Sequence, residues 1–349
     1  MILIHIESGL GNQMLSYCEL IALKKSNPNQ NFYVETIVYD IPECHETICQ
    51  WNGYELERIF NIQATNIKTR FRTNEWQAIE ENVRQSLFWE KKWNYPVYIT
   101  KALSTHGLKL ENIRGDFEIQ SNKSSWQKGW KGELRSYVAD KTRIGNWLKR
   151  KILFNSYHER TSLQDVLFLK TDSDVFTGQR LSFKLRGAGI ERIREEIEQT
   201  FQFPSYSSSK NEDFSKFLDS HNSVFIHARR GDMLSSNGWC YKYGYFRRAV
   251  KYIKKNVKDP VFVFFTNTGS IEWCKQNEDI FSLDFTKDEV YFVDWNSGEE
   301  SFRDMQLMSH CKHGIITNSS FGWWGAFLIR NPNKITISPL VEINTTYHC

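Results

Sequence analysis

The sequence lacks a hydrophobic run long enough to cross a bilayer. Its apolar runs, such as residues 261–265 with the sequence VFVFF, fall far short of the roughly 20 residues that a spanning helix needs. The first residues, 1–6, have no basic region ahead of them and no small-residue cleavage site, and a glycine turn follows at once. We expect a first strand there, no signal peptide and no membrane span.

Cysteine is sparse and unpatterned. The seven cysteines are scattered and contain no C-x-x-C, which argues against both a disulfide framework and a zinc site. We therefore expect a cytoplasmic protein.

An excess of either charge is missing as well. The 45 Lys and Arg against 41 Asp and Glu leave a formal charge of +4. A protein that grips nucleic acid through its phosphates is expected to be far more basic, so we expect no nucleic-acid partner. Any anion is expected to be held by a few local residues.

The amino-terminal segment has the pattern of a strand, a glycine turn and a helix. A strand pattern at 2–7 precedes Gly9-Leu10-Gly11-Asn12-Gln13, and apolar residues from Met14 onward recur at helical spacing. A second strand is predicted over 32–39, so a parallel α/β sheet begins here. The turn glycines allow close approach of a ligand, but Met14 replaces the third glycine of a dinucleotide-binding motif.

Residues 70–150 are less regular and rich in tryptophan. These indoles either belong to the core of a helical region or line a sugar-binding cleft, and the sequence does not decide between the two. The segment 147–151, in which Trp147 precedes three basic residues, can contact anionic lipid or form an ordinary solvated helix face.

A domain boundary is predicted near residue 205. An amphipathic helix is expected over 189–203, and the polar, serine-rich stretch 205–213 is expected to be a linker. This divides the chain into domains 1–205 and 206–349.

The second half alternates between strand and helix patterns. Helices are expected near 243–256, 270–277, 300–310 and 320–330, between strands at 223–228, 261–266, 290–293, 314–317 and 334–338. This rhythm predicts a doubly wound parallel sheet, whose ligands bind beyond the carboxyl ends of the strands.

The strand at 223–228 is expected to carry charged residues to its carboxyl end, namely His227, Arg229, Arg230 and Asp232. An arginine fork matches pairs of phosphate oxygens and can stabilise the charge that develops on a departing diphosphate. Alternatively, Arg230 forms a structural salt bridge with Asp232.

A second polar group follows the strand at 314–317. Asn318, Ser319, Ser320 and Phe321 stand where a helix begins, and a helix N-terminus favours a phosphate. The serines can instead serve only as helix caps. Asp304, near the start of another helix, can accept hydrogen bonds from a guanine or merely complement the helix dipole.

Three stretches together resemble the alpha-1,2-fucosyltransferases of glycosyltransferase family 11. They are Gly9-x-Gly11-Asn12-Gln13, His227-x-Arg229-Arg230-Gly231-Asp232, and the block 304–326 with Asn318-Ser319-Ser320-Phe321-Gly322-Trp323-Trp324-Gly325-Ala326. Residues 40–185 resemble the family poorly.

The resemblance implies a GT-B-type fold, in which two Rossmann-like α/β domains face a cleft. It also implies GDP-L-fucose as donor, no cofactor or metal, and a single displacement that inverts the anomeric carbon. The string Asp172-Ser173-Asp174 matches a metal-binding Asp-x-Asp, but no strand pattern precedes it, and we interpret it as a chance match.

Residue roles follow from the matched motifs. Arg229 is implied as the catalytic residue that neutralises the leaving GDP. The donor is expected to be bound by His227, Arg230, Asp232, Asp304, Asn318, Ser319, Ser320, Phe321, Gly9, Gly11 and Asn12. Residues 266–269 depart from the family pattern, so donor contacts are not carried over to that loop.

The resemblance thus implies transfer of L-fucose to O2 of a terminal β-galactoside, such as one in lipopolysaccharide or another surface glycan. The acceptor is assigned to domain 1–205 and the donor to domain 206–349. The base is Glu7, Asp116 or another amino-terminal carboxylate, or no strong base is used. Peripheral contact with the inner membrane surface is a further expectation. The alternatives are a transferase for another GDP-sugar or acceptor and a non-catalytic glycan-binding protein.

Overall fold

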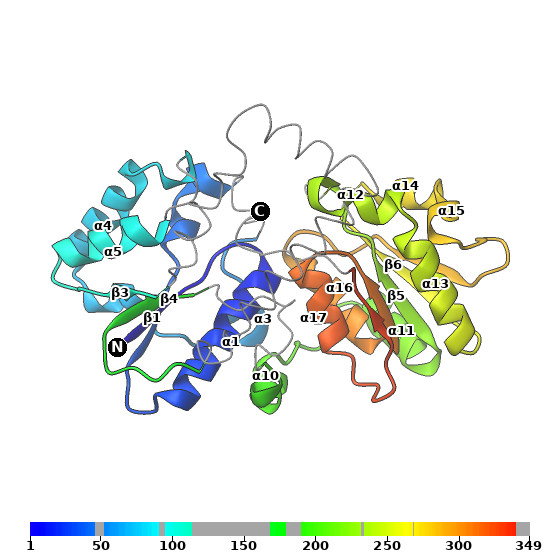
Figure 1. The fold of residues 1–349 in the computed structure, drawn as a ribbon, viewed down its shortest axis with the longest axis horizontal. Coiled ribbons are helices and arrows are strands. Elements are labelled where there is room, and N and C mark those ends of the chain that lie inside the picture. The colour runs from blue at the N-terminus through cyan, green and yellow to red at the C-terminus, as the bar shows by residue number, and fades with distance from the viewer. Residues whose placement is uncertain are drawn as a thin grey trace, which may run out of the picture. The chain divides into compact units, whose positions relative to one another are not determined.

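The computed structural model describes residues 1–45, 52–90, 95–113, 168–178, 190–231, 234–267 and 269–339. The chain forms two compact units, each with its own parallel sheet (Figure 1). Unit 1 comprises Met1–Glu7, Gln13–Gln50 and Gln63–Ile197, and unit 2 comprises Ser8–Asn12, Trp51–Ile62 and Glu198–Cys349. The prediction of a mixed α/β protein with parallel sheets is confirmed.

The sheet of unit 1 has the strand order β2-β1-β4-β3, and all its pairings are parallel. Its strands are β1 (Ile2–His5), β2 (Phe32–Glu35), β3 (Glu111–Asn112) and β4 (Val175–Thr177). Every residue of β1 is buried, as expected of a central strand covered on both faces.

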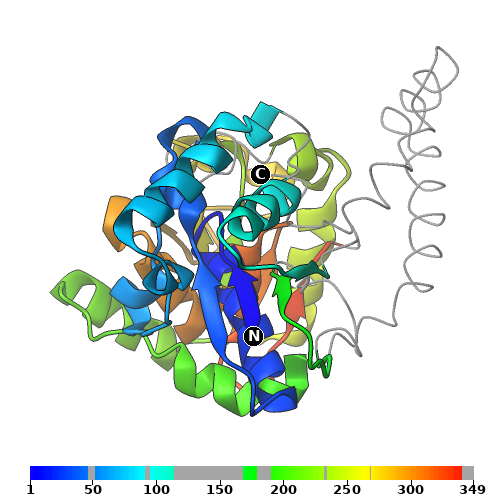
Figure 2. The same cartoon turned by 90° about the vertical axis from the view of Figure 1, so that its left-hand side faces the viewer.

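Helices cover the sheet of unit 1 (Figure 2). The long helix α1 (Leu10–Ser26) follows β1, and α4 (Thr73–Gln85) and α5 (Tyr95–Thr105) pack on each other. Short 3-10 helices are η1 (Ile37–Asp40), η2 (Pro42–Cys44), η3 (Ile67–Arg70), η4 (Phe88–Glu90) and η6 (Ile190–Ile193). Helix α10 (Arg194–Thr200) follows η6, so the helix predicted at 189–203 is present but shorter.

The second strand is also shorter than predicted. The pattern over 32–39 suggested one continuous strand, but β2 ends at Glu35. The Glu35 carboxylate accepts a hydrogen bond of 2.5 Å from the Ile37 N–H, and this turns the chain into η1.

The sheet of unit 2 follows the predicted alternation closely. Its strands are β5 (Ser223–His227), β6 (Val261–Phe265), β7 (Val290–Val293), β8 (His313–Ile316) and β9 (Thr336–Ile337). They are all parallel, in the order β7-β6-β5-β8-β9. The chain therefore winds outward from β5 in one direction and then, from β8, in the other.

Helices lie on both faces of this sheet because alternate strand residues point to opposite sides. Val224 and Ile226 of β5 pack in one core cluster with α13 (Tyr245–Asn256), α14 (Ile271–Lys275) and α15 (Glu278–Phe281). Phe225 points the other way, into a cluster with α11 (Ser209–Ser220), α16 (Phe302–His310) and α17 (Ser320–Phe327). The remaining elements of unit 2 are α3 (Leu56–Phe60), α12 (Leu234–Lys242) and η8 (Gly298–Glu300).

The stretch 205–213, expected to be a linker, is one only in part, because α11 already begins at Ser209 and buries Asn211, Ser215 and Leu218.

The tryptophans of the 70–150 region are described only in part. Trp76 and Trp89 belong to the core of unit 1. Trp93, Trp126, Trp130 and the segment 147–151 lie outside the described residues.

None of the helices within the described ranges combines the length and the apolar character that a bilayer span requires.

Candidate functional site

The carboxyl ends of β5 and β8 form the point where the sheet of unit 2 changes its winding direction. The two strands are parallel neighbours, with His227 opposite Ile316. Because β6 and β7 follow on one side and β9 on the other, the connections leaving β5 and β8 diverge. Open α/β sheets bind ligands at such switch points.

The backbone that follows β5 is fixed by the neighbouring strands. The Arg229 N–H donates to Thr317 Oγ1 over 3.1 Å, and the Thr317 hydroxyl donates to the carbonyl of His227 over 3.1 Å. On the other side, the Arg230 N–H donates to Asn267 Oδ1 over 2.9 Å. These contacts hold the loop to the segments after both β8 and β6.

A glycine in the same loop allows this close approach. Gly231 has a φ of +54°, and a Cβ there would lie 2.6 Å from Asn267 Nδ2. A larger residue would therefore be strained by its backbone and would press against the side chain that holds Arg230.

The two arginines have different surroundings. The guanidinium of Arg230 lies 3.3 Å from the centroid of the Trp273 ring and 5.1 Å from that of Tyr241, so it is stacked in an aromatic setting. Arg229 is half-buried, and its carbonyl accepts a hydrogen bond of 2.9 Å from the Tyr241 hydroxyl. Asp232, the alternative partner of Arg230, lies outside the described residues.

His227 is a buried, neutral residue at the base of the site. Burial and the positive charge of Arg229 lower its pKa to about 3. Its Nδ1 has no hydrogen-bond partner among the described residues and lies against Gly322. A Cβ at residue 322 would come within 2.2 Å of that nitrogen, so α17 can pack over His227 only with glycine there.

Helix α17 presents its N-terminus beside this loop. Ser319 is the N-cap with extended backbone, and Ser320 is the first helical residue. Both are half-buried. Asn318 is fully buried, and the Phe321 ring centroid lies 6.0 Å from that of His227. Free N–H groups, two hydroxyls and the helix dipole at this end favour an anion.

The other end of α17 is capped by a lysine. Lys334 Nζ donates to the carbonyls of Ala326, Phe327 and Ile329 at 2.9, 2.8 and 3.0 Å. A cation at a helix C-terminus complements the dipole and satisfies carbonyls that lack helical partners. This contact fixes the axis of the helix whose N-terminus faces the loop.

The glycine turn after β1 packs on α17. The indole Nε1 of Trp324 donates to the carbonyl of Gly11 over 2.9 Å. A Cβ at residue 11 would lie 2.7 Å from Ser320 Oγ and 2.8 Å from the N of Phe321, so only glycine fits. Gly9 is half-buried and Asn12 is 9% exposed. The structure therefore brings the first and last predicted motifs together.

Asp304 belongs to a separate polar network in the first turn of α16. Asn296 Nδ2 donates to Asp304 Oδ1 over 2.8 Å, and Asn211 Nδ2 donates to Asn296 Oδ1 over 2.8 Å. Trp295 Nε1 donates to Asn211 Oδ1 over 2.7 Å. Burial raises the pKa of Asp304 to about 7, although the hydrogen bond from Asn296 opposes this shift.

Unit 1 contains a buried cluster of ionisable residues that sequence reasoning missed apart from Glu7. His5 Nδ1 lies 2.6 Å from Glu35 Oε2, and His5 Nε2 lies 2.9 Å from Glu7 Oε2. The Tyr95 hydroxyl donates to Glu35 Oε1 over 2.7 Å. Burial lowers the pKa of His5, but the two carboxylates outweigh it and the net shift is upward. The available signal was an ionisable residue at the carboxyl end of each strand, His5 in β1 and Glu35 in β2.

The Asp172-Ser173-Asp174 string lies just before β4 in unit 1. Asp174 is paired with the amino group of Met1. Within the described residues, no group of three or more His, Cys, Asp or Glu side chains is arranged to hold a metal ion. Asp116, the other candidate base, is outside these residues.

Comparison with known proteins adds a family match. Residues 193–347 match the family model described as Glycosyl transferase family 11. An alpha-1,2-colitosyltransferase from Escherichia coli is 41% identical over 125 residues, which are 34% of this chain and 40% of that protein. The O-antigen biosynthesis glycosyltransferase WbnK, also from Escherichia coli, is 33% identical over 34% of this chain and 38% of its own length.

A mammalian relative gives a similar match. Galactoside alpha-(1,2)-fucosyltransferase 1 from Plecturocebus brunneus is 32% identical over 30% of this chain and 28% of its own length. The matched region thus spans at most two fifths of these three relatives. Among solved structures, the fucosyltransferase NodZ from Bradyrhizobium has a TM-score of 0.45 and 11% identity, covering 93% of this chain and 91% of that one.

Proposed function

We propose, from the match of residues 193–347 to the model of glycosyltransferase family 11, that this chain is an inverting alpha-1,2-fucosyltransferase. It transfers L-fucose from GDP-L-fucose to O2 of a terminal β-galactoside in a surface glycan. Its fold is proposed to be of the GT-B type, with the donor bound by the carboxyl-terminal domain 206–349 and the acceptor by the amino-terminal domain 1–205. The names of the three curated relatives, which include two alpha-1,2-transferases, support this proposal.

The observation that carries the proposal is the meeting of two features at one switch point. The loop that bears Arg229 is hydrogen-bonded through Thr317 to the strand end that leads into Ser319 and Ser320. The backbone that bears Arg229 and a helix N-terminus are thereby held at the same edge of the sheet. An arginine and a helix N-terminus both stabilise phosphate oxygens, so a nucleotide diphosphate is the anion that fits this edge best.

In the proposed mechanism, an acceptor hydroxyl attacks the anomeric carbon of fucose from the face opposite the diphosphate. The bond to the diphosphate oxygen breaks as the new glycosidic bond forms, and the configuration changes from β to α. Arg229 and the α17 N-terminus neutralise the charge that accumulates on GDP. Groups of this kind contribute on the order of 10²–10³ in rate each. No metal ion or cofactor is needed in this scheme.

The other donor-site residues are assigned as follows. Asp304 is proposed to accept the guanine N–H groups, and its hydrogen bond with Asn296 would orient the carboxylate for this role. Gly9, Gly11 and Asn12 are proposed to border the diphosphate, with His227, Arg230, Asp232, Asn318 and Phe321 completing the site. The acceptor proton is taken by Glu7, by Asp116 or directly by solvent.

The test is a transfer assay with purified protein. GDP-L-fucose is incubated with lactose, N-acetyllactosamine and a type 1 disaccharide in the presence of EDTA, and the linkage of the product is determined by NMR. We expect a fucose in α linkage to O2 of galactose. Strict dependence on added Mn²⁺, or a product with another linkage, would contradict the proposal.

A second candidate is transfer of a different GDP-linked sugar. The relative named alpha-1,2-colitosyltransferase favours it, because colitose is L-fucose without the hydroxyl at C3. Competition between GDP-L-fucose and GDP-colitose in the same assay distinguishes the two, since the donor with the higher kcat/KM is the substrate. Binding of a glycan without turnover of either donor would support the third alternative, a glycan-binding protein.

The enzyme is proposed to work in the cytoplasm, with peripheral contact to the inner membrane surface where a lipid-linked acceptor would be presented. The segment 147–151, which first suggested such contact, lies outside the described residues.

A further inference from the structure

Helix α13 has a basic outer side. Its inner side packs on the sheet of unit 2 through Tyr245, Phe246, Ala249, Val250 and Ile253, which are all buried. Residues 234–258, which include this helix, contain seven Lys or Arg and no Asp or Glu, although the chain as a whole carries only +4. The positive charge of this part of the surface is therefore segregated.

The charged residues form a row along the helix. Arg247, Lys251 and Lys255 are spaced four residues apart, so they lie above one another, and Arg248 and Tyr252 lie beside them. All five are exposed, and Tyr252 is 54% exposed. Like charges four residues apart destabilise a helix. Folding does not require this row, which points to a role in binding.

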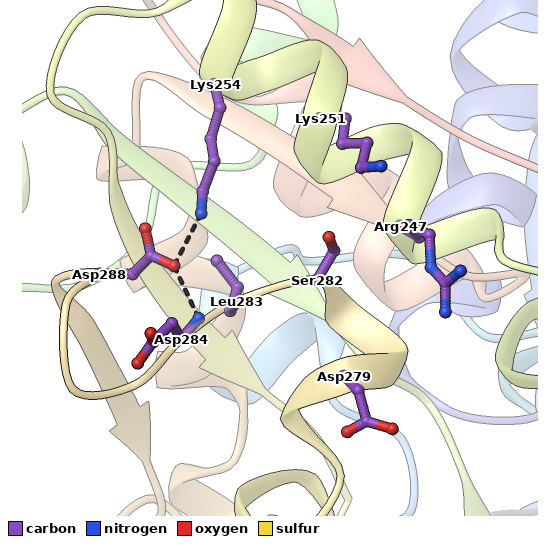
Figure 3. A pocket seen from close by; sticks show the side chains of 8 residues that line it. All are labelled: Arg247, Lys251, Lys254, Asp279, Ser282, Leu283, Asp284 and Asp288. Carbon is purple, nitrogen blue, oxygen red and sulfur yellow. Dashed lines mark hydrogen bonds and ion pairs between the residues drawn. The ribbon is translucent and has the colours of Figure 1, made fainter.

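A groove runs along one flank of α13, and some of the basic side chains that line it form ion pairs with acidic residues. It has a volume of about 450 Å³ and is lined by Arg247, Lys251, Lys254, Asp279, Ser282, Leu283, Asp284 and Asp288 (Figure 3). Lys254 Nζ lies 2.7 Å from Asp288 Oδ2, and Asp284 is paired with Lys287 at 2.6 Å.

The remaining bases lack such partners. Within the described parts of the chain, no carboxylate lies within 4 Å of the charged groups of Arg247, Lys251 and Lys255. The third acid that lines the groove, Asp279, therefore forms no ion pair with them. We call Arg247, Arg248, Lys251, Tyr252 and Lys255 the basic face. No ion pair with another described residue neutralises the charge of its Arg247, Lys251 and Lys255.

We propose that the basic face docks this chain onto an anionic phospholipid surface. A row of Lys and Arg on a surface helix, with an exposed tyrosine among them, matches the charge and the polar–apolar boundary of a lipid headgroup layer. Protein interfaces are depleted of Lys at their centre, which argues against a protein partner. The small net charge of the chain argues against nucleic acid. This inference deepens the proposed membrane contact but does not depend on the sugar transferred.

The experiment is vesicle sedimentation with the full-length protein. Phosphatidylcholine vesicles with and without phosphatidylglycerol are compared at about 0.1 M and about 1 M NaCl, between which the Debye length falls from about 10 Å to about 3 Å. We expect binding only to the anionic vesicles and only at the lower salt concentration. The variant R247Q/K251Q/K255Q keeps helix propensity, because Gln, Lys and Arg are nearly equal as helix formers.

A matched control removes the same charge elsewhere in unit 2. In K216Q/K275Q/K287Q, each lysine has an acidic partner in the wild-type structure, namely Glu212, Glu272 and Asp284. Each base near an anionic surface changes partitioning roughly fivefold, so the variant of the basic face should lose about a hundredfold in vesicle affinity. The control should lose far less.

Several results would overturn the inference. They are failure of the wild type to bind anionic vesicles at low salt, binding that persists at high salt, and equal losses in the two triple variants. Polyglutamate or duplex DNA could also displace the protein from the vesicles. If either does so when its concentration of negative charges is below that of the anionic lipid, the basic face would instead be assigned to an acidic protein or a nucleic acid. Turnover of soluble donor and disaccharide should be the same in all three proteins. Vesicle binding without any turnover would refute the proposed enzyme and leave this inference standing.

Discussion

The indole of Trp324 donates a hydrogen bond of 2.9 Å to the carbonyl of Gly11, although 313 positions separate the two residues in the chain. Both belong to unit 2, and the contact is buried. It holds the glycine turn against the N-terminal turn of α17, where Ser320 begins the helix. The first prediction concerns this close approach.

Replacing Gly11 by alanine should destabilise the protein by about 1–3 kcal/mol, because the new methyl group would overlap Ser320 Oγ and the backbone of Phe321. Urea denaturation measures the change in the free energy of unfolding. Gly238 in α12 is a matched control, since a Cβ there meets nothing within 4 Å. Its replacement by alanine should be neutral or stabilising by about 0.5–1 kcal/mol, because alanine is the better helix former. Equal losses in both variants would contradict the packing described.

The second prediction concerns the arginine assigned to the diphosphate. Arg229→Ala should lower kcat by on the order of 10²–10³, whereas Arg229→Lys should recover part of the loss, because it keeps the charge but not the fork. Steady-state kinetics with GDP-L-fucose provide the measurement. Lys216→Ala, a change of an exposed lysine on α11, serves as the control and should leave kcat unchanged. Wild-type kcat in Arg229→Ala would remove this residue from the mechanism.

The pH dependence of stability should report on Asp304. The pKa of this carboxyl is about 7 in the folded chain against an ordinary value of 3.8. Between these two pH values the folded chain retains a proton that the unfolded chain has lost, so stability should fall as the pH rises from about 4 to about 7. Asp304→Asn should flatten this fall by about 2 kcal/mol, allowing for the partial exposure of the residue.

The control for this measurement is Asp213→Asn, which changes a carboxyl that is 77% exposed. Its stability profile should follow that of the wild type. If the profile of Asp304→Asn also coincides with the wild type, the raised pKa is refuted.

The fourth prediction concerns His5. Its pKa is raised by Glu35 and Glu7 against the opposing effect of burial, so the imidazolium stabilises the fold below pH 6.5 and this contribution is lost as the pH rises through the folded pKa. Glu35→Gln removes the larger of the two carboxylate effects. NMR titration should then place the His5 pKa below that of the wild type.

An exposed glutamate provides the comparison for His5. Glu111→Gln in β3 changes a carboxylate that is exposed to solvent. This variant should leave the pKa of His5 unchanged. A pKa of His5 that does not move in Glu35→Gln would show that Glu35 is not its principal partner.

Much of unit 2 could be predicted because its central strands β5, β6 and β8 are buried throughout and therefore appear as short, largely apolar runs. The five strands and four helices expected between residues 223 and 338 are all present, with ends that differ by a few residues. The motifs after β5 and β8 were also placed correctly, since the carboxyl ends of parallel strands share one edge of a sheet.

Contacts between distant side chains were not predictable in the same way. Arg230 has its charge over the Trp273 ring, and nothing in the local sequence distinguishes that indole from other core residues. His5 and Glu35 lie opposite each other in the register of β1 and β2, which depends on a strand pairing that the sequence does not specify. The two-residue strand β3 is exposed and polar, so it has no apolar pattern at all.

The way the chain threads unit 2 has a consequence for engineering. Ser8–Asn12 and Trp51–Ile62 complete this unit together with the segment from Glu198 onward. A carboxyl-terminal fragment or chimera cut at a single point near residue 205 would therefore keep Trp324 but discard its native neighbours Gly11 and Phe201. Exchange of unit 2 between homologues requires three transplanted segments, and a simple fusion would yield a poorly folded hybrid.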